Sequence, residues 1–237
     1  MPVSLKELEL ELKKVFRPEQ FKDYCPNGLQ VEGRKEISKL VTGVTACQEL
    51  ITAAVEAGAD ALLVHHGYFW RGEDQSISGI KKTRIEALLK HDLSLFAYHL
   101  PLDVHREFGN NVQLGKVLGI EIDGEIGKQN NHPIGLTGTI DQDTDFDSLK
   151  ALIADKLDRQ PLAIEGNSRR IRSIAWCTGA AQNYIELAVA AGVDAYITGE
   201  VSEPTVHIAR ESGIHFFSAG HHATERYGVQ AIGGHLA

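Results

Sequence analysis

An internal repeat is the feature of this sequence that most narrows its possible folds. Residues 54–61 read AVEAGADA and residues 188–195 read AVAAGVDA, with Gln48 and Gln182 at the same distance upstream. In both copies an apolar helical pattern stops at a glycine, which favours a helix terminus, and a short apolar run follows. Self-similarity of this kind indicates two related α/β halves in one chain.

Alternating strand and helix patterns surround both copies of the repeat. A strand that begins at Leu93 is expected to run until Pro101 forces it to end. We therefore predict an α/β fold of two related domains with an internal duplication, in which mixed sheets are flanked by helices. The predicted domains are residues 1–125, completed by 220–237, and residues 126–219, with a boundary in the Gly-, Asn- and Pro-containing stretch 124–138.

Composition and charge exclude several classes of protein. The chain has 237 residues and a formal net charge of −8, without a run of Lys or Arg, so nucleic acid is not expected as its main partner. Cys25, Cys47 and Cys177 show no paired spacing, which argues against a disulfide framework or a thiolate zinc site. No apolar stretch approaches the roughly 18 residues of a membrane-spanning helix. We expect a cytoplasmic protein that does not bind membranes.

Two adjacent histidines, His65 and His66, come where the strand of the first repeat copy is expected to end. In an open α/β sheet this rim is where ligands bind. Side chains at successive strand positions point to opposite faces, so the pair cannot bind one ion from a regular strand but could bind two neighbouring ions. A core histidine next to a hydrogen-bonded surface histidine is the alternative interpretation of the pair alone.

Other residues with metal-binding chemistry follow two further predicted strands. Asp103 comes two residues after Pro101, and His221 and Glu225 have the helical spacing that puts both on one face. A mixed imidazole and carboxylate set suits zinc, iron, manganese or nickel and does not choose among them. Each element also occurs by chance, but their joint occurrence at strand ends favours a metal site.

Five segments of the sequence carry a resemblance to a known family. They are PNGLQVEG at 26–33, VHHGYFW at 64–70, HLPLD at 99–103, TGEVSE at 198–203 and GHHATER at 220–226. In this order they resemble segments of the GTP cyclohydrolase I type 2 homologue family. The members of that family are Nif-three-like proteins with a dinuclear metal centre. The resemblance implies a two-domain α/β fold, two divalent metal ions per subunit, and a toroidal homohexamer built as a trimer of dimers.

The resemblance also implies roles for the candidate ligands. His66 and Asp103 would bind one ion, His65 and His221 would bind the other, and Glu225 would bridge both. As the bridging carboxylate, Glu225 is also the candidate catalytic residue.

Three further residues are candidates for substrate binding. His99 would orient a ligand or contact the substrate, unless it is a packed strand histidine, and His222 would face substrate, support a ligand or be solvated. Tyr68 belongs with Phe69 and Trp70 to an aromatic group that would stack on a ring beside the site or, as we prefer, fill a subunit interface.

The ligand set points to hydrolysis, because two neighbouring ions lower the pKa of a bridging water and hold the oxygen that it attacks. We expect a metal-dependent hydrolase, and the resemblance suggests a nucleotide or related heterocycle as substrate, including GTP ring opening or damaged nucleotides. No Walker-type phosphate loop supports GTP itself. Two alternatives stay open: a non-catalytic, metal-binding ring-shaped assembly that acts through protein partners, and a di-iron redox enzyme.

Overall fold

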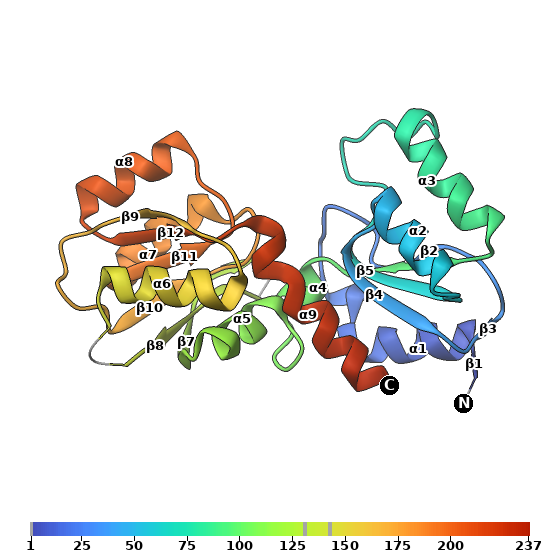
Figure 1. Ribbon diagram of the computed structural model, residues 1–237, viewed down its shortest axis with the longest axis horizontal. Coiled ribbons are helices and arrows are strands. Elements are labelled where there is room, and N and C mark those ends of the chain that lie inside the picture. Colours follow the sequence, from blue (N-terminus) through green and yellow to red (C-terminus); the bar gives the residue numbers. More distant parts are fainter. Residues whose placement is uncertain (1, 130–131, 142–143) are drawn as a thin grey trace. The chain divides into compact units, whose positions relative to one another are not determined.

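The computed structural model describes residues 2–129, 132–141 and 144–237. Its internal contacts divide the chain into two compact units, which we call unit 1 (up to His105, with Val229–Ala237) and unit 2 (Arg106–Gly228). Each unit is a β-sheet with helices packed against it (Figure 1). The predicted α/β fold, with helices flanking mixed sheets, is confirmed.

The main sheet of unit 1 has the strand order β2-β6-β5-β4, in which β4, β5 and β6 are parallel and β2 is an antiparallel edge. Its apolar strand β5 is buried on both faces because helices lie on both sides of the sheet, with α2 and α3 opposite α1 (Figure 1). A separate ribbon pairs β1 with β3. The strands are β1 (Val3–Ser4), β2 (Gly28–Val31), β3 (Glu36–Ile37), β4 (Leu40–Thr45), β5 (Ala61–His66) and β6 (Ser94–Ala97).

The helices of unit 1 begin where the local sequence provides a cap or a turn. Ser4 and Glu7 form the capping box that starts the first helix, each side chain accepting from the other residue's backbone N–H. The last helix of the chain, α9, contributes residues to both units. The helices are α1 (Leu5–Phe16), η1 (Pro18–Gln20), α2 (Gln48–Glu56), α3 (Gly79–Lys90), α4 (Leu100–Asp103) and α9 (His221–Leu236).

Unit 2 has a six-stranded sheet with the order β7-β8-β10-β11-β12-β9, in which only β10, β11 and β12 are parallel neighbours. Side chains on the two faces of this sheet pack into two separate hydrophobic cores. Trp176 of β10 packs with α5 and α6, whereas Tyr196 of β11 packs with α7 on the other face. Its elements are α5 (Asn110–Leu118), β7 (Glu121–Gln129), β8 (His132–Thr139), α6 (Phe146–Leu157), β9 (Leu162–Ile164), β10 (Ser173–Trp176), η2 (Gln182–Tyr184), α7 (Ile185–Ala191), β11 (Ala195–Thr198), α8 (Glu203–Ser212) and β12 (His215–Ser218).

The internal repeat is visible in matching turns and hydrogen bonds. Gly58 and Gly192, which follow α2 and α7, have left-handed φ angles of 69° and 70°. In both copies the aspartate two residues later accepts hydrogen bonds from backbone N–H groups at or just before the start of a neighbouring strand, β4 in unit 1 and β10 in unit 2. Asp60 Oδ2 accepts from two successive backbone N–H groups at 2.7 and 2.9 Å, and Asp194 Oδ2 does so at 2.9 and 3.0 Å. In both units, therefore, the aspartate that precedes one strand (β5 or β11) binds the backbone at the start of its parallel neighbour (β4 or β10).

One predicted strand ends earlier than expected, and a helical turn takes the place of its last residues. The strand starting near Leu93 ends at Ala97, and Leu100–Asp103 form the single helical turn α4. Pro101 fits there because the first turn of a helix needs no N–H from it. The stretch 124–138 falls largely within β7 and β8. The predicted domains stay a prediction, and the compact units differ from them in residues 106–125 and 220–228.

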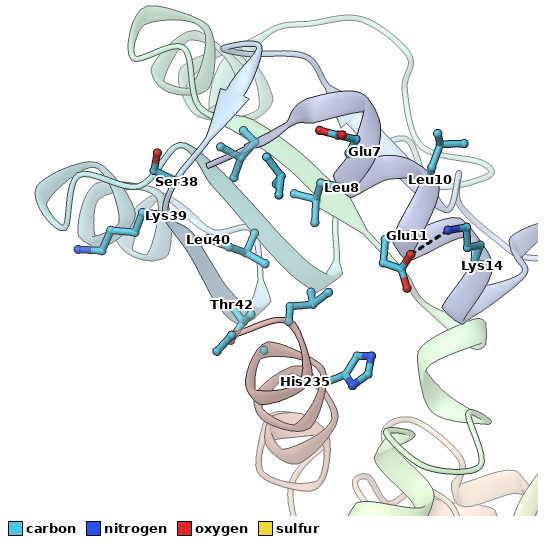
Figure 2. Close-up of a pocket in the computed structure, with 15 residues that line it drawn as sticks. Glu7, Leu8, Leu10, Glu11, Lys14, Ser38, Lys39, Leu40, Thr42 and His235 are labelled. Carbon is cyan, nitrogen blue, oxygen red and sulfur yellow. Dashed lines mark hydrogen bonds and ion pairs between the residues drawn. The ribbon is translucent and has the colours of Figure 1, made fainter. Parts of the chain in front are cut away.

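A cavity of about 810 Å³ opens within unit 1 between α1, β4 and the last turn of α9. Figure 2 shows Leu8, Leu40 and His235 around it. Among the described residues, no predicted metal or substrate residue lines this cavity. Within residues 2–129, 132–141 and 144–237, no helix is both long enough and apolar enough to cross a membrane.

We expect Asp60→Asn and Asp194→Asn each to lower the free energy of unfolding at neutral pH by about 1–3 kcal/mol, because a charged acceptor of two backbone N–H groups is lost. Burial acts to raise the pKa of each carboxyl, but these N–H donors hold the pKa below its ordinary value. The stabilisation is therefore complete above about pH 4 and is lost as the pH falls through the folded-state pKa.

Urea unfolding of wild type and variants at neutral pH and at about pH 3 measures this effect, and the difference should shrink in acid. Asp155→Asn, whose side chain is 76% exposed, is the matched control. An equal loss at both pH values, or the same loss in the control, would contradict the assignment.

Candidate metal centre

The carboxyl end of β5 brings two imidazoles together in unit 1. His65 is fully buried and His66 is partly exposed. Strand alternation predicts that the two side chains point to opposite faces of the sheet. Their ring centroids are nevertheless only 4.3 Å apart, with an angle of 42° between the ring planes. His99, which follows β6, offers a third imidazole, and one nitrogen from each of the three rings lies within 4.8 Å of the others. This rim of unit 1 thus concentrates metal-binding nitrogen atoms.

A hydrogen bond at Nδ1 orients both histidines of the pair. The backbone carbonyl of Tyr98 lies 3.0 Å from Nδ1 of His65, and because a carbonyl can only accept, Nδ1 is the donor. Nδ1 of His66 lies 3.2 Å from the hydroxyl oxygen of Thr45. Metal-binding histidines usually hold one ring nitrogen in such a bond and offer the other to the ion. Nε2 is the atom that these rings offer.

Asp103, on α4, faces His65 within the same unit. Its Oδ1 lies 3.4 Å from Nε2 of His65. In a neutral His65 ring with the proton on Nδ1, Nε2 presents a lone pair to the Asp103 carboxylate. Two electron-rich groups at this distance are stabilised by a positive charge, either a proton or a metal ion. The donors fit a divalent cation, and the contact of Asp103 is with His65, whereas the resemblance pairs Asp103 with His66.

Unit 2 contains a second arrangement of the same kind at the start of α9. His221 and the buried Glu225 are one helical turn apart, with Nε2 3.2 Å from Oε1. Nδ1 of His221 lies 2.7 Å from Oε1 of Glu200. The hydrogen bond to Glu225 and the charges of both carboxylates raise the pKa of His221 to about 9, although burial acts to lower it. This imidazole therefore lies where a positive charge is strongly favoured.

Glu200 is a site residue that the sequence reasoning missed. The resemblance, which includes it in the segment TGEVSE, gives it no role, although it holds the position that His66 has in the first copy. The signal was present, because a carboxylate at the rim of a repeated strand can serve the same site as the histidine it replaces. Gly179 was also missed: a Cβ there would collide with Oε1 of Glu225, so its lack of a side chain makes room for this carboxylate.

The candidate substrate residues lie in different surroundings. Tyr68 is buried, its hydroxyl donates to the carbonyl of Ala46 at 2.7 Å, and burial raises its pKa. Contact with a substrate would require this bond to break. His222 is exposed on α9, and His99 lies beside the histidine pair. The roles of all three in substrate binding stay predictions.

We expect Glu200→Gln to weaken metal binding about 10- to 100-fold, because the amide no longer orients His221 or increases its basicity as the carboxylate does. Competition with a chromophoric chelator, using metal-stripped protein, measures the affinity. Glu203→Gln, in the exposed first turn of α8, is the control and should bind metal like wild type. Equal affinities of the two variants would remove Glu200 from the site.

Comparisons with known proteins agree with the resemblance drawn from the sequence. A family model described as Duf34/NIF3 (NGG1p interacting factor 3) matches residues 3–237. The "GTP cyclohydrolase 1 type 2 homolog" of Pseudomonas aeruginosa is 53% identical over 236 residues, which are 100% of this chain and 93% of that protein. The protein of the same name from Escherichia coli K12 is 48% identical over 227 residues, which are 95% and 90% of the two chains.

Solved structures give the same result for the fold. A structure titled protein ybgI, of unknown function, has a TM-score of 0.95 at 46% identity, covering 99% of this chain and 93% of that chain. The protein TTHA1606 from Thermus thermophilus has a TM-score of 0.86 at 30% identity, with the same coverage of 99% and 93%. From the match over nearly its whole length, we conclude that this chain belongs to the Duf34/NIF3 family.

Proposed function

We propose that this chain is a metal-dependent hydrolase of a nucleotide or related heterocycle, and that two divalent metal ions are held by His65, His66, Asp103, His221 and Glu225. One observation carries the proposal: in each unit an imidazole fixed at Nδ1 presents Nε2 to a carboxylate, at 3.4 Å in unit 1 and 3.2 Å in unit 2. The name of the relatives, GTP cyclohydrolase 1 type 2 homolog, supports the substrate class.

The protein's own groups define what such a site would do. Bound ions of this kind would supply a water activated near neutral pH. The Nδ1 hydrogen bonds of His65 and His221 keep the ligand nitrogens in place without further reorganisation. Glu225, which is 3% exposed, would balance the charge of the cations inside a site with little water. Zinc, iron, manganese and nickel all suit these donors.

Assembly and location belong to the same proposal. The homohexamer, a trimer of dimers, rests on the family resemblance, and the cytoplasmic location rests on the sequence. Both stay predictions.

We expect Glu225→Gln to abolish paired metal loading, because an amide oxygen is a poorer ligand and carries no charge to offset a second cation. Elemental analysis of protein that has been stripped of metal and then reconstituted gives the metal content per subunit. Glu211→Gln, an exposed position on α8, serves as the control. An unchanged metal content in Glu225→Gln would count against the ligand set.

We expect hydrolysis of a nucleotide or phosphoester by the reconstituted protein to disappear in the metal-stripped form, because no activated water remains. A screen of these compounds against both forms is the measurement. Activity that survives stripping would refute hydrolysis at this centre. Metal binding without turnover would favour the non-catalytic assembly, and turnover that requires iron together with an oxidant would favour the redox alternative.

A further inference from the structure

In unit 1, His99 is held by hydrogen bonds at both its ring and its backbone. Its Nδ1 lies 2.7 Å from Oδ1 of Asp23, and its backbone N–H donates to Oδ1 of Asn27 at 2.7 Å. The Asp23 carboxylate also accepts from Nδ2 of Asn27 and from the backbone N–H of Leu100, at 2.8 and 2.9 Å. Burial acts to raise the pKa of Asp23, but these donors, led by His99, hold it below its ordinary value.

This network decides which way His99 presents its ring. An ionised carboxylate can only accept, so the neutral ring keeps its proton on Nδ1 and has its lone pair on Nε2. The His99 ring centroid lies 5.1 Å from that of His65 and 5.7 Å from that of His66. In the neutral ring, Nε2 of His99 is thus a hydrogen-bond acceptor beside the histidine pair.

The indole ring of Trp70, which we call the aromatic wall, packs against the His99 ring. It meets His99 edge to face, with centroids 5.0 Å apart and planes at 80°, and it lies 5.9 Å from His66. Its indole N–H donates to the carbonyl of Gly67 at 3.1 Å, which fixes the orientation of the ring. The side chain is partly exposed, so one part of the indole is available to a ligand. Aromatic rings in this position select planar partners.

Several contacts hold Trp70 where it is. The preceding residue, Phe69, has φ 65°, a left-handed conformation that is strained for a bulky side chain. Lys81 lies over the Phe69 ring at 5.2 Å, and the Trp70 backbone N–H donates to the carboxylate of Glu73 at 3.1 Å. Arg71 donates through its side chain to the carbonyl of Asp23 at 3.1 Å. The wall and the His99 network are therefore tied together.

We infer that Trp70 and His99 recognise the ring of the substrate, and that this ring is a planar nitrogen heterocycle carrying an N–H or amino donor. Trp70 selects the planar shape, and Nε2 of His99 selects the donor. Asp23 is a positioning residue, because it acts only through His99. The inference rests on the proposed function for its place beside the metal ligands, but the ring contact itself needs no metal.

The first experiment measures ring binding to metal-stripped protein by tryptophan fluorescence. The chain has two tryptophans, and since Trp176 is fully buried, quenching by a stacked ring reports on Trp70. We expect guanosine, which has ring N–H and amino donors, to bind about 10-fold or more tightly than purine riboside, which has neither. Ribose 5-phosphate should cause no quenching. Equal binding of the two nucleosides would overturn the inference.

The second experiment uses the tautomer of His99. In Asp23→Asn the amide can donate to Nδ1, which moves the ring proton to Nε2 and turns the acceptor into a donor. We expect the preference to invert, so that purine riboside binds more tightly than guanosine in titration calorimetry. A merely structural role of Asp23 would weaken both ligands alike, and this result would refute its positioning role.

Should Asp23→Asn fail to fold, nitrogen-15 spectra of metal-stripped wild-type protein report the tautomer directly. A proton on Nδ1 of His99 is expected, and a neutral ring with its proton on Nε2 would overturn the inference.

Variants of Trp70 test the wall separately. In titration calorimetry, which does not need the Trp70 fluorophore, Trp70→Leu should lose guanosine binding by about 10-fold or more, whereas Trp70→Phe should retain most of it, because the effect depends on an aromatic face. Unchanged binding in Trp70→Leu together with altered sedimentation would assign this residue to a subunit interface and refute its recognition role. All these measurements omit metal, so a failed hydrolase assay leaves them intact, and their failure leaves metal-dependent hydrolysis untouched.

Discussion

The meeting of an imidazole Nε2 with a carboxylate oxygen is the interaction on which the rest of this candidate site depends. It joins His65 to Asp103 in unit 1 and His221 to Glu225 in unit 2. A lone pair opposite an anion needs a positive charge between them. A proton satisfies this need at His221, whose pKa is raised to about 9, and a divalent metal ion would satisfy it at both places. The Nδ1 hydrogen bonds matter because they prevent the rings from turning away.

The internal duplication explains why the two units can carry different chemistry on the same frame. In both copies a glycine turn leads from helix to strand, and the following aspartate binds the amino end of the neighbouring parallel strand. The carboxyl end has no part in that junction, so its residues can differ without changing the fold. The first copy ends in His65 and His66, and the second ends in Gly199 and Glu200.

Much of the fold could be predicted because it depends on local patterns. Apolar runs and glycine helix ends indicated the elements that surround both copies of the repeat. The segment after β6 was misread as strand, because its leucines suit a strand and a proline can either end a strand or begin a helix. Asp103 was still recognised as a candidate ligand, since its position after β6 does not depend on which element carries it.

The sequence by itself determined the order of elements, the duplication and the residue types able to bind metal, because periodicity, turn chemistry and ligand chemistry are properties of short segments. Only the tertiary structure decided which nitrogen each histidine presents and which carboxylate orients it. Asp23 and His99 are 76 residues apart, and Glu200 and His221 are 21 apart. No local pattern encodes such contacts, since they exist only after separate strands have paired into a sheet and brought their ends together.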